Sequence, residues 1–215
     1  MLRVVETFVS IQGESARAGE LCFFIRLAGC NLGCAYCDTR YANESGAGRG
    51  IAAAELLDAA KQARVPLVEV TGGEPLLQSE TPELCRMLLD AGFTVLVETN
   101  GSQPIDRLPE GVHAIMDVKT PGSAMAGSFL AANFDALRPG DEVKFVLTGR
   151  GDYEFALRTI REHRLDGKPA VTILFGAVAE SLPPAQLAEW MIADRVAARF
   201  QLQLHKVLWG DRRGV

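Results

Sequence analysis

Long apolar segments are missing from this sequence. No apolar run approaches the ~18 residues that a membrane-spanning helix needs. The N-terminus, MLRVVETFVSIQGES, also lacks the apolar core of ~7–15 residues found in secretory signals, and Glu6 stands where that core would lie. We therefore predict no membrane partner, no secretory signal and a cytoplasmic location.

An excess of positive charge is missing as well. The 22 lysine and arginine residues are outnumbered by 27 aspartate and glutamate residues, which gives a net charge of −5. This balance argues against a surface that coats nucleic acid, although a local basic pocket is compatible with it. We predict no nucleic-acid partner.

Cysteine is scarce and its count is odd. Five cysteines are too few for a disulfide scaffold. Cys22 and Cys85 stand alone in apolar surroundings, which is typical of buried, inert thiols. Cys30, Cys34 and Cys37 lie within eight residues, and such a cluster in a reducing compartment indicates a metal or iron–sulfur site.

Strand-like and helix-like segments alternate along the chain. Apolar and β-branched segments predict strands at 21–28, 67–71, 93–98, 114–118, 142–147, 170–175 and 200–204. Helices are predicted at 52–64, 81–91, 152–164 and 183–196, the second capped by Thr81 and ended by Gly92. This alternation predicts an α/β fold with helices covering a parallel sheet. A length of 215 residues favours a single domain, 1–215.

Two architectures fit this alternation. A closed eight-fold barrel typically takes ~250 residues, which is more than this chain has. Residues 31–50, including the glycine-rich segment 46–50, are also predicted to form a loop. An open, partial barrel and a doubly wound sheet both stay compatible with the length. In either fold, ligands bind at the carboxyl ends of the strands. We therefore look for function in the motifs that follow strands.

The cysteine motif CNLGCAYC follows directly on the first of these predicted strands. Gly29 and Gly33 allow the backbone to turn tightly, so that three thiolates can surround one compact centre. Structural zinc needs four closed ligands, but no second cysteine pair exists and the histidines are scattered singly. The spacing favours an iron–sulfur cluster with one open iron, while zinc and unliganded thiols are the alternatives.

A second motif, TGGEP at 71–75, ends the next predicted strand. A strand-to-helix turn would explain its glycines alone, but together with the C-x3-C-x2-C loop it resembles the radical S-adenosylmethionine (SAM) superfamily. The resemblance implies an open β/α barrel of about six to seven mostly parallel strands. It also implies a 4Fe-4S cluster on the three cysteines, whose free iron chelates SAM and whose electron cleaves it to methionine and a 5′-deoxyadenosyl radical. On this resemblance Tyr36 lies near the adenine and Glu74 binds the methionyl amino group.

A narrower resemblance runs from Phe8 to Val215. The segment SIQGES at 10–15, Arg26, the CDT run at 37–39 and the C-terminal QLHKVLWGDRRGV are similar to the 7-carboxy-7-deazaguanine synthase family. This implies a homodimeric lyase of queuosine and deazapurine biosynthesis, which converts 6-carboxy-5,6,7,8-tetrahydropterin to 7-carboxy-7-deazaguanine and ammonia. The implied partners are the pterin substrate, Mg²⁺ and an electron donor such as flavodoxin.

The family's functional positions fall on residues of this chain. Those that match substrate contacts are Ile11, Gln12, Gly13, Arg26 and Thr71. Those that match SAM contacts are Tyr36, Cys37, Asp38, Gly73, Glu74, Asp117, Val118 and Lys119. Thr39 matches the Mg²⁺ position. Beyond the cluster and SAM no separate catalytic residue is implied, and the terminal Val215 carries over no terminal-proline contact.

Several of these positions have a second explanation. An arginine within an apolar strand is costly unless paired, so Arg26 fits either a substrate carboxylate or a structural ion pair. Thr39 alone fits a helix cap equally well, and Asp117 with Lys119 fits an exposed ion pair. The pair His205–Lys206 either approaches the site or lies on the surface. The side chain of Gln12 is expected to meet the amide-like edge of a pterin.

Two other functions stay open. A glycyl-radical activase shares the cysteine loop and the GGE motif but acts on a protein. A zinc-stabilised binding module would have no catalytic activity. The IQGE segment, Arg26 and the CDT run favour the pterin enzyme.

Overall fold

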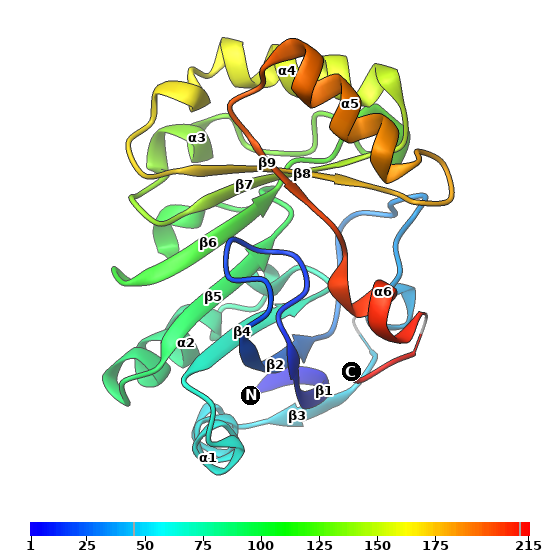
Figure 1. Cartoon of the computed structure of the whole chain (residues 1–215). Helices are drawn as coiled ribbons and strands as arrows, with labels where there is room; N and C mark the ends of the chain where they lie inside the picture. Colours follow the sequence, from blue (N-terminus) through cyan, green and yellow to red (C-terminus); the bar gives the residue numbers. More distant parts are fainter. Residues whose placement is uncertain (45, 211) are drawn as a thin grey trace.

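The computed structural model of the chain describes residues 1–44, 46–210 and 212–215. Its strands are β1 (Leu2–Ile11), β2 (Leu21–Leu27), β3 (Arg49–Ile51), β4 (Leu67–Gly72), β5 (Thr94–Thr99), β6 (Val112–Asp117), β7 (Glu142–Leu147), β8 (Thr172–Ala177) and β9 (Arg199–Gln201). They form one nine-stranded sheet in the order β3-β1-β2-β4-β5-β6-β7-β8-β9. In the described part of the chain β3 and β9 are its edges, so the barrel is open (Figure 1).

One strand of the described sheet, β1, runs opposite to its neighbours. From β2 through β9 each neighbouring pair is parallel, whereas β1 pairs antiparallel with both β2 and β3. The parallel strands are the ones that the sequence pattern predicts, with boundaries shifted by a few residues. The count of six to seven strands was too low, because β1 and β3 had not been assigned. Polar and apolar residues alternate irregularly in β1, which has a register shift between Val4 and Glu6, and β3 lies partly in the glycine-rich segment.

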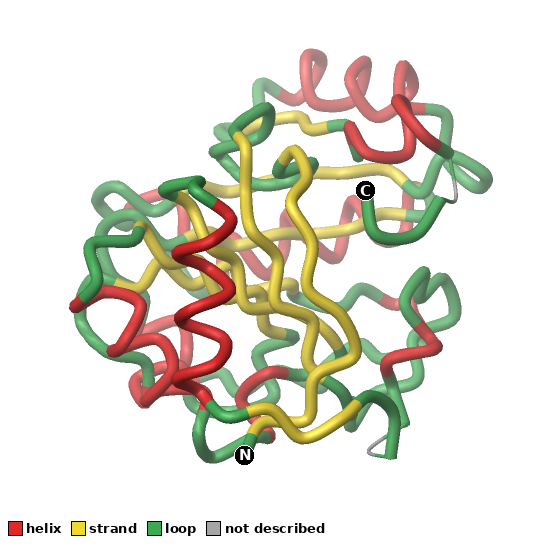
Figure 2. The backbone as a smooth tube through the Cα atoms, turned by 90° about the horizontal axis from the view of Figure 1, so that it is seen from below, coloured by secondary structure: helices red, strands yellow, loops and turns green. Residues whose placement is uncertain are grey.

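The helices lie around the sheet, with the strands in the middle of the molecule (Figure 2). The α-helices are α1 (Ala53–Ala63), α2 (Thr81–Asp90), α3 (Ala132–Ala136), α4 (Arg150–Glu162), α5 (Pro184–Asp194) and α6 (Leu204–Trp209). Short 3-10 turns are η1 (Arg40–Ala42), η2 (Pro75–Leu77), η3 (Ile105–Arg107), η4 (Pro121–Ser123) and η5 (Leu165–Gly167). The predicted cap on α2 was wrong, because the Thr81 hydroxyl donates to the Pro75 carbonyl at 2.7 Å and Glu80 occupies the cap position.

The two faces of the sheet differ in polarity, and this difference positions the site. On β2, Phe23 and Ile25 belong to the apolar core shared with α1 and α2, while Cys22 and Phe24 face the opposite side, as strand alternation requires. A second outer core packs β6, β7 and β8 against α4 and α5. The inner face has a small apolar cluster among the described residues: Cys22, Phe24, Leu67, Leu96 and Ile115, with Phe8 against it. Charged side chains, among them Glu69, Glu98, Asp117 and Lys144, share this face and line the cavity.

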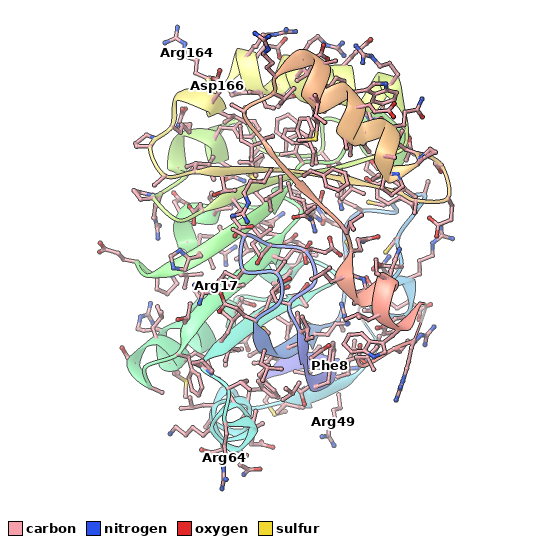
Figure 3. All side chains as sticks on the ribbon, in the orientation of Figure 1. Phe8, Arg17, Arg49, Arg64, Arg164 and Asp166 are labelled. Atoms are coloured by element: carbon pink, nitrogen blue, oxygen red, sulfur yellow. The ribbon has the colours of Figure 1, made fainter. Side chains whose placement is uncertain are left out.

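Charged side chains are exposed at both ends of the molecule. Arg64 and Arg164 are exposed and project from opposite ends of the molecule (Figure 3). Among the helices of the described ranges, none combines the length and apolar character needed to cross a membrane.

Candidate active site

A cavity of about 720 Å³ lies at the carboxyl ends of the parallel strands. Residues of α6, the red helix of Figure 1, and the C-terminal residues 212–215 complete its wall. Lys206 Nζ of this helix lies 3.8 Å from Asp38 Oδ2, beside the cysteine loop. The predicted site residues that line it are Ile11, Gln12, Gly13, Arg26, Cys30, Cys34, Tyr36, Cys37, Asp38, Thr39, Thr71, Gly73, Asp117 and Lys119. Two predicted residues, Glu74 and Val118, do not line the cavity.

The cysteine loop is held in place by backbone hydrogen bonds. The Cys30 N–H donates to the Asn43 carbonyl at 2.9 Å, and the Ala35 N–H donates to the Ser123 carbonyl at 2.9 Å. Cys30, Cys34 and Cys37 are free, partly exposed thiols on the cavity wall. Burial raises the pKa of Cys30 and of Cys34. The free energy of metal binding would therefore have to offset the cost of deprotonating these thiols.

The arrangement of these thiols fits a cluster better than an ion. In the described residues, no group of three or more His, Cys, Asp or Glu side chains is placed to hold one metal ion. Three thiols around one part of a cavity wall suit a larger body, and cysteine thiolates are the usual ligands of 4Fe-4S clusters. Cys22 and Cys85 are buried elsewhere, in β2 and α2, and supply no fourth thiol to the cavity.

The two glycines at the end of β4 allow the chain to cross the start of the cysteine loop. Gly72 has φ +137°, and a Cβ there would overlap the Leu27 carbonyl. A Cβ on Gly73 would overlap the Gly29 carbonyl. The close approach is fixed by hydrogen bonds from the Gly73 N–H to Leu27 O at 3.1 Å and from the Glu74 N–H to Gly29 O at 2.7 Å. The glycines therefore bring the two motifs together.

Glu74 lies behind the cavity wall. Its side chain is fully buried and accepts hydrogen bonds from Leu76 N at 3.0 Å, Thr99 Oγ1 at 2.8 Å and Asn100 N at 2.7 Å. Burial raises the pKa of this carboxyl, and the three donors act against that shift. Glu74 therefore ties the end of β4 to the end of β5 and has no free face toward the cavity.

Arg26 forms an ion pair through Nε, and its Nη donors remain available to a ligand. Its Nε donates to Glu6 Oε1 at 2.8 Å, and the Tyr41 hydroxyl donates to the same oxygen at 2.7 Å. Its guanidinium lies 5.7 Å from the ring centroid of Phe8, which Figure 3 labels. Within the described ranges no hydrogen bond occupies its Nη atoms, and the residue lines the cavity. Those atoms suit an anionic ligand.

The side chain of Gln12 is turned into the protein. Its Oε1 accepts from the Glu14 N–H at 2.6 Å and the Ser15 N–H at 3.2 Å, and its Nε2 donates to Glu69. Only 3% of Gln12 is exposed. The amide oxygen expected to meet a pterin edge is therefore occupied, and Gln12 instead shapes the loop that precedes β2.

A buried group of charged side chains, which sequence reasoning missed, forms the floor of the cavity. Lys144 Nζ contacts Glu98, Glu14 Oε2 at 3.1 Å and Asp117 Oδ2 at 3.6 Å. Thr71 Oγ1 adds a hydrogen bond to Glu98 Oε2 at 3.3 Å. The signal was present, since a charged residue within an apolar strand such as EVKFVL needs a partner. The partners themselves depend on which strands become neighbours.

Two buried carboxyls of this floor have pKa values shifted in opposite directions. Burial and the charge of Glu98 raise the pKa of Glu69 to about 8. Burial would also raise the pKa of Glu14, but the charges of Lys144 and His205 outweigh it and lower that pKa to about 2. Glu69 therefore binds its proton more tightly than an ordinary carboxyl does.

Asp117 and Lys119 form a largely buried pair rather than an exposed one. Lys119 Nζ donates to Asp117 Oδ2 at 2.7 Å, and the Asp117 carboxylate is 8% exposed. Burial raises the pKa of Tyr36, whose hydroxyl donates to the Val146 carbonyl at 3.3 Å beside them. Val118 is fully buried and donates its N–H to the Lys144 carbonyl at 2.8 Å, so it acts through the backbone.

Thr39 and the pair His205–Lys206 each had two explanations in the sequence, and the structure gives their positions. Thr39 precedes η1 but forms no side-chain cap, and its Oγ1 lies 3.7 Å from Cys37 Sγ on the cavity wall. His205 and Lys206 both line the cavity, and His205 Nε2 lies 3.9 Å from Glu14 Oε1.

Known proteins are similar to this chain in sequence and in fold. The sequence model of the radical SAM superfamily matches residues 24–178. A 7-carboxy-7-deazaguanine synthase from Chlorobaculum tepidum is 48% identical over 100% of this chain and 97% of its own, and one from Koribacter versatilis is 40% identical over 97% of each. The crystal structure of QueE from Escherichia coli superposes with a TM-score of 0.78 and 25% identity, covering 94% of this chain and 93% of that one.

These matches span the cysteine loop, the glycine turn and the strands that carry Arg26 and Lys144. A superfamily match over most of the chain, together with relatives of this identity over its whole length, shows the family. The chain belongs to the radical SAM superfamily and, within it, to the 7-carboxy-7-deazaguanine synthase family.

Proposed function

We propose that this chain converts 6-carboxy-5,6,7,8-tetrahydropterin to 7-carboxy-7-deazaguanine with release of ammonia, as a lyase of queuosine and deazapurine biosynthesis. One observation carries the proposal. The three free thiols of the cysteine loop share one cavity of about 720 Å³ with the Nη atoms of Arg26, which form no hydrogen bond within residues 1–44, 46–210 and 212–215. That cavity offers a place for a cluster, SAM and a carboxylated substrate side by side.

Cys30, Cys34 and Cys37 would hold a 4Fe-4S cluster and leave one iron without a protein ligand. When bound, the cluster and SAM supply the electron and the 5′-deoxyadenosyl radical for abstraction of a substrate hydrogen atom. The residues proposed to bind SAM directly are Tyr36, Cys37, Asp38, Gly73, Asp117 and Lys119. Glu74 and Val118 support that site from behind, through the end of β5 and through the backbone of β7.

The substrate is proposed to lie against β2 and β4. Arg26 would bind its carboxylate through Nη1 and Nη2, because a guanidinium offers paired donors to a carboxylate. Thr71 and the loop Ile11–Gly13 would contact the pterin ring from the wall they line. The protein's task is to orient the substrate and exclude water while the cofactor supplies the radical chemistry.

A magnesium ion is proposed at Thr39. Its hydroxyl lies on the cavity wall next to the cysteine loop, where a hard cation could bridge it to substrate oxygens. Mg²⁺ keeps several waters, so Thr39 together with substrate oxygens and waters would complete its ligands. Such an ion would orient the substrate carboxylate and act as a Lewis acid.

The partners of the reaction are also proposals. The whole chain, 1–215, is proposed to act as one domain and to pair with a second copy as a homodimer in the cytoplasm. The electron would come from a small redox protein such as flavodoxin.

Anaerobic turnover tests the function. Reconstituted protein, incubated with reductant, SAM and 6-carboxytetrahydropterin, should consume the pterin and release ammonia and the deazapurine in equal amounts, as read by mass spectrometry. The amount of deazapurine formed should exceed the amount of SAM consumed, because SAM is used catalytically. Protein that cleaves SAM but leaves the pterin intact would instead favour a glycyl-radical activase, and stoichiometric zinc without iron or sulfide would favour a zinc-stabilised binding module.

A further inference from the structure

Two asparagine side chains direct their amides at the cysteine sulfurs. Asn100, which follows β5, places Nδ2 3.8 Å from Cys30 Sγ. Asn43, which follows η1, places Nδ2 3.7 Å from Cys37 Sγ. The two donors come from different parts of the chain and reach different cysteines. Neither asparagine belongs to the cysteine motif or to the TGGEP motif.

The direction of the Asn100 amide is fixed by its other contacts. Its Oδ1 accepts the Ser102 N–H at 2.9 Å, so the NH₂ end must point the other way. One Nδ2 hydrogen meets Asn31 Oδ1 at 3.2 Å, which leaves the second for Cys30 Sγ. The Asn100 N–H donates to Glu74 at 2.7 Å, and the residue is 6% exposed. The buried glutamate of the GGE motif thus acts on the first cysteine through Asn100.

Asn43 is fixed through its backbone. Its carbonyl accepts the Cys30 N–H at 2.9 Å, and its N–H donates to the Arg40 carbonyl at 3.1 Å. The Asn43 side chain lines the cavity next to Cys37. No amide contact of this kind reaches Cys34 within the described residues, so the donors act on two of the three sulfurs.

A hydrogen bond to a cluster sulfur changes the reduction potential because the two oxidation states differ in charge. Reduction adds one electron to the cluster and its thiolates, and an N–H donor stabilises the more negative state more strongly. Removing such a donor therefore makes the potential more negative. In the low-dielectric cavity wall the effect is larger than it would be in water.

We propose that Asn43 and Asn100 are positioning residues that set the reduction potential of the cluster by donating hydrogen bonds to the thiolates of Cys37 and Cys30. The electron arrives from an external low-potential donor, which is oxidised by one electron as the cluster gains it. The inference rests on the cluster-binding part of the proposed function and does not depend on the identity of the substrate.

Redox titration of the full-length, anaerobically reconstituted protein tests this inference. The variants are Asn43→Ala, Asn100→Ala and the double variant, and the reduced fraction is read from the EPR signal without SAM. Each single variant should keep the parent's iron and sulfide content and show a two- to tenfold lower ratio of reduced to oxidised cluster at a fixed solution potential. A tenfold ratio corresponds to about 59 mV for one electron. The shifts should add in the double variant, because the donors contact different sulfurs.

Gln103→Ala is the matched control. It removes a side-chain amide on the same loop that donates to the Ser102 carbonyl at 3.1 Å and contacts neither a cysteine sulfur nor the Asn100 side chain, so the potential should not change. Unchanged potentials in both asparagine variants would overturn the inference. Loss of iron from either variant would overturn it for that residue, because the amide would then be needed to build the site. A parent protein without a 4Fe-4S signal would refute the proposed function itself, which is a separate result.

Discussion

Several charged side chains around the cavity already have protein partners. Lys144 is 3% exposed and contacts three carboxylates, and Arg26 is paired through Nε with Glu6. A buried charge is tolerated only when it is paired and hydrogen-bonded. Among the described residues, the groups of the cavity wall left to bind ligands include the Nη atoms of Arg26 and the three thiols.

Replacing Arg26 tests its substrate role. Arg26→Ala should raise KM for the pterin by about 10- to 100-fold, because a charge-assisted hydrogen bond contributes roughly 1.5–3 kcal/mol. Iron content should equal that of the parent. Arg86→Ala, an exposed change on α2, is the control and should leave KM unchanged. Normal turnover of the Arg26 variant at low pterin concentration would exclude the carboxylate role.

Removing the central cation should destabilise the fold. Lys144→Met leaves Glu14, Glu98 and Asp117 without their shared partner, and loss of one member of a buried pair costs about 3–5 kcal/mol. Urea unfolding measures the loss. Lys61→Met, at an exposed position of α1, should change the unfolding free energy by less than about 0.5 kcal/mol. Equal midpoints for the two variants would show that the lysine does not hold the floor together.

Single residues divide into those that local pattern reveals and those that need the fold. Cys30, Cys34 and Cys37 are visible by spacing, and Arg26 is visible as a charge in an apolar strand. The roles of Asn100 and of the partners of Lys144 are not visible, because segments distant in sequence, on or next to different strands, meet only once the sheet has formed. The direction of the Gln12 side chain likewise depends on Glu69, which is distant in sequence.

At the scale of elements, the end of β4 is the joint on which the site depends. Its two glycines pass against the backbone at the start of the cysteine loop, and Glu74 ties it to β5. The parallel strands follow from apolar runs between helices, whereas β1 and β3 are too irregular or too short to be assigned from pattern alone. The cysteine motif and the TGGEP motif each follow a predicted parallel strand. Because the carboxyl ends of parallel strands lie at one edge of the sheet, this position predicted that the two motifs lie close together.

Gly73→Ala tests this joint. A Cβ at that position overlaps the Gly29 carbonyl, a backbone atom that cannot move without shifting Cys30. We expect a loss of about 1–3 kcal/mol in unfolding free energy and reduced iron loading on reconstitution. Gly149→Ala is the matched control, since a Cβ there meets nothing within 4 Å, and it should load iron normally. Full iron content in the Gly73 variant would contradict the close approach.

At the scale of the whole molecule, the inner face of the sheet is a charged interior enclosed by apolar cores. Burial and the charge of Glu98 raise the pKa of Glu69 to about 8, and burial raises the pKa of Glu142 to about 7, both from an ordinary 4.5. A carboxyl with a raised pKa binds its proton more tightly in the folded state. Its contribution to stability is therefore complete below pH 4.5 and is lost as pH rises toward 8.

The pH dependence of unfolding should follow from these two groups. The free energy of unfolding should fall between about pH 5 and pH 8, and Glu69→Gln should reduce that slope, because the amide cannot lose a proton. Glu110→Gln, at an exposed position, should leave the slope as it is. Urea titrations at several pH values measure it, and a slope that is the same in parent and Glu69 variant would show that Glu69 is already ionised.

The central claim is that one cavity holds the cluster, SAM and the pterin together. The most direct measurement is turnover with pterin deuterated at C6, followed by mass spectrometry of recovered SAM and 5′-deoxyadenosine. Direct hydrogen transfer within the cavity predicts deuterium in that pool. Formation of the deazapurine with no deuterium in SAM or 5′-deoxyadenosine would contradict it.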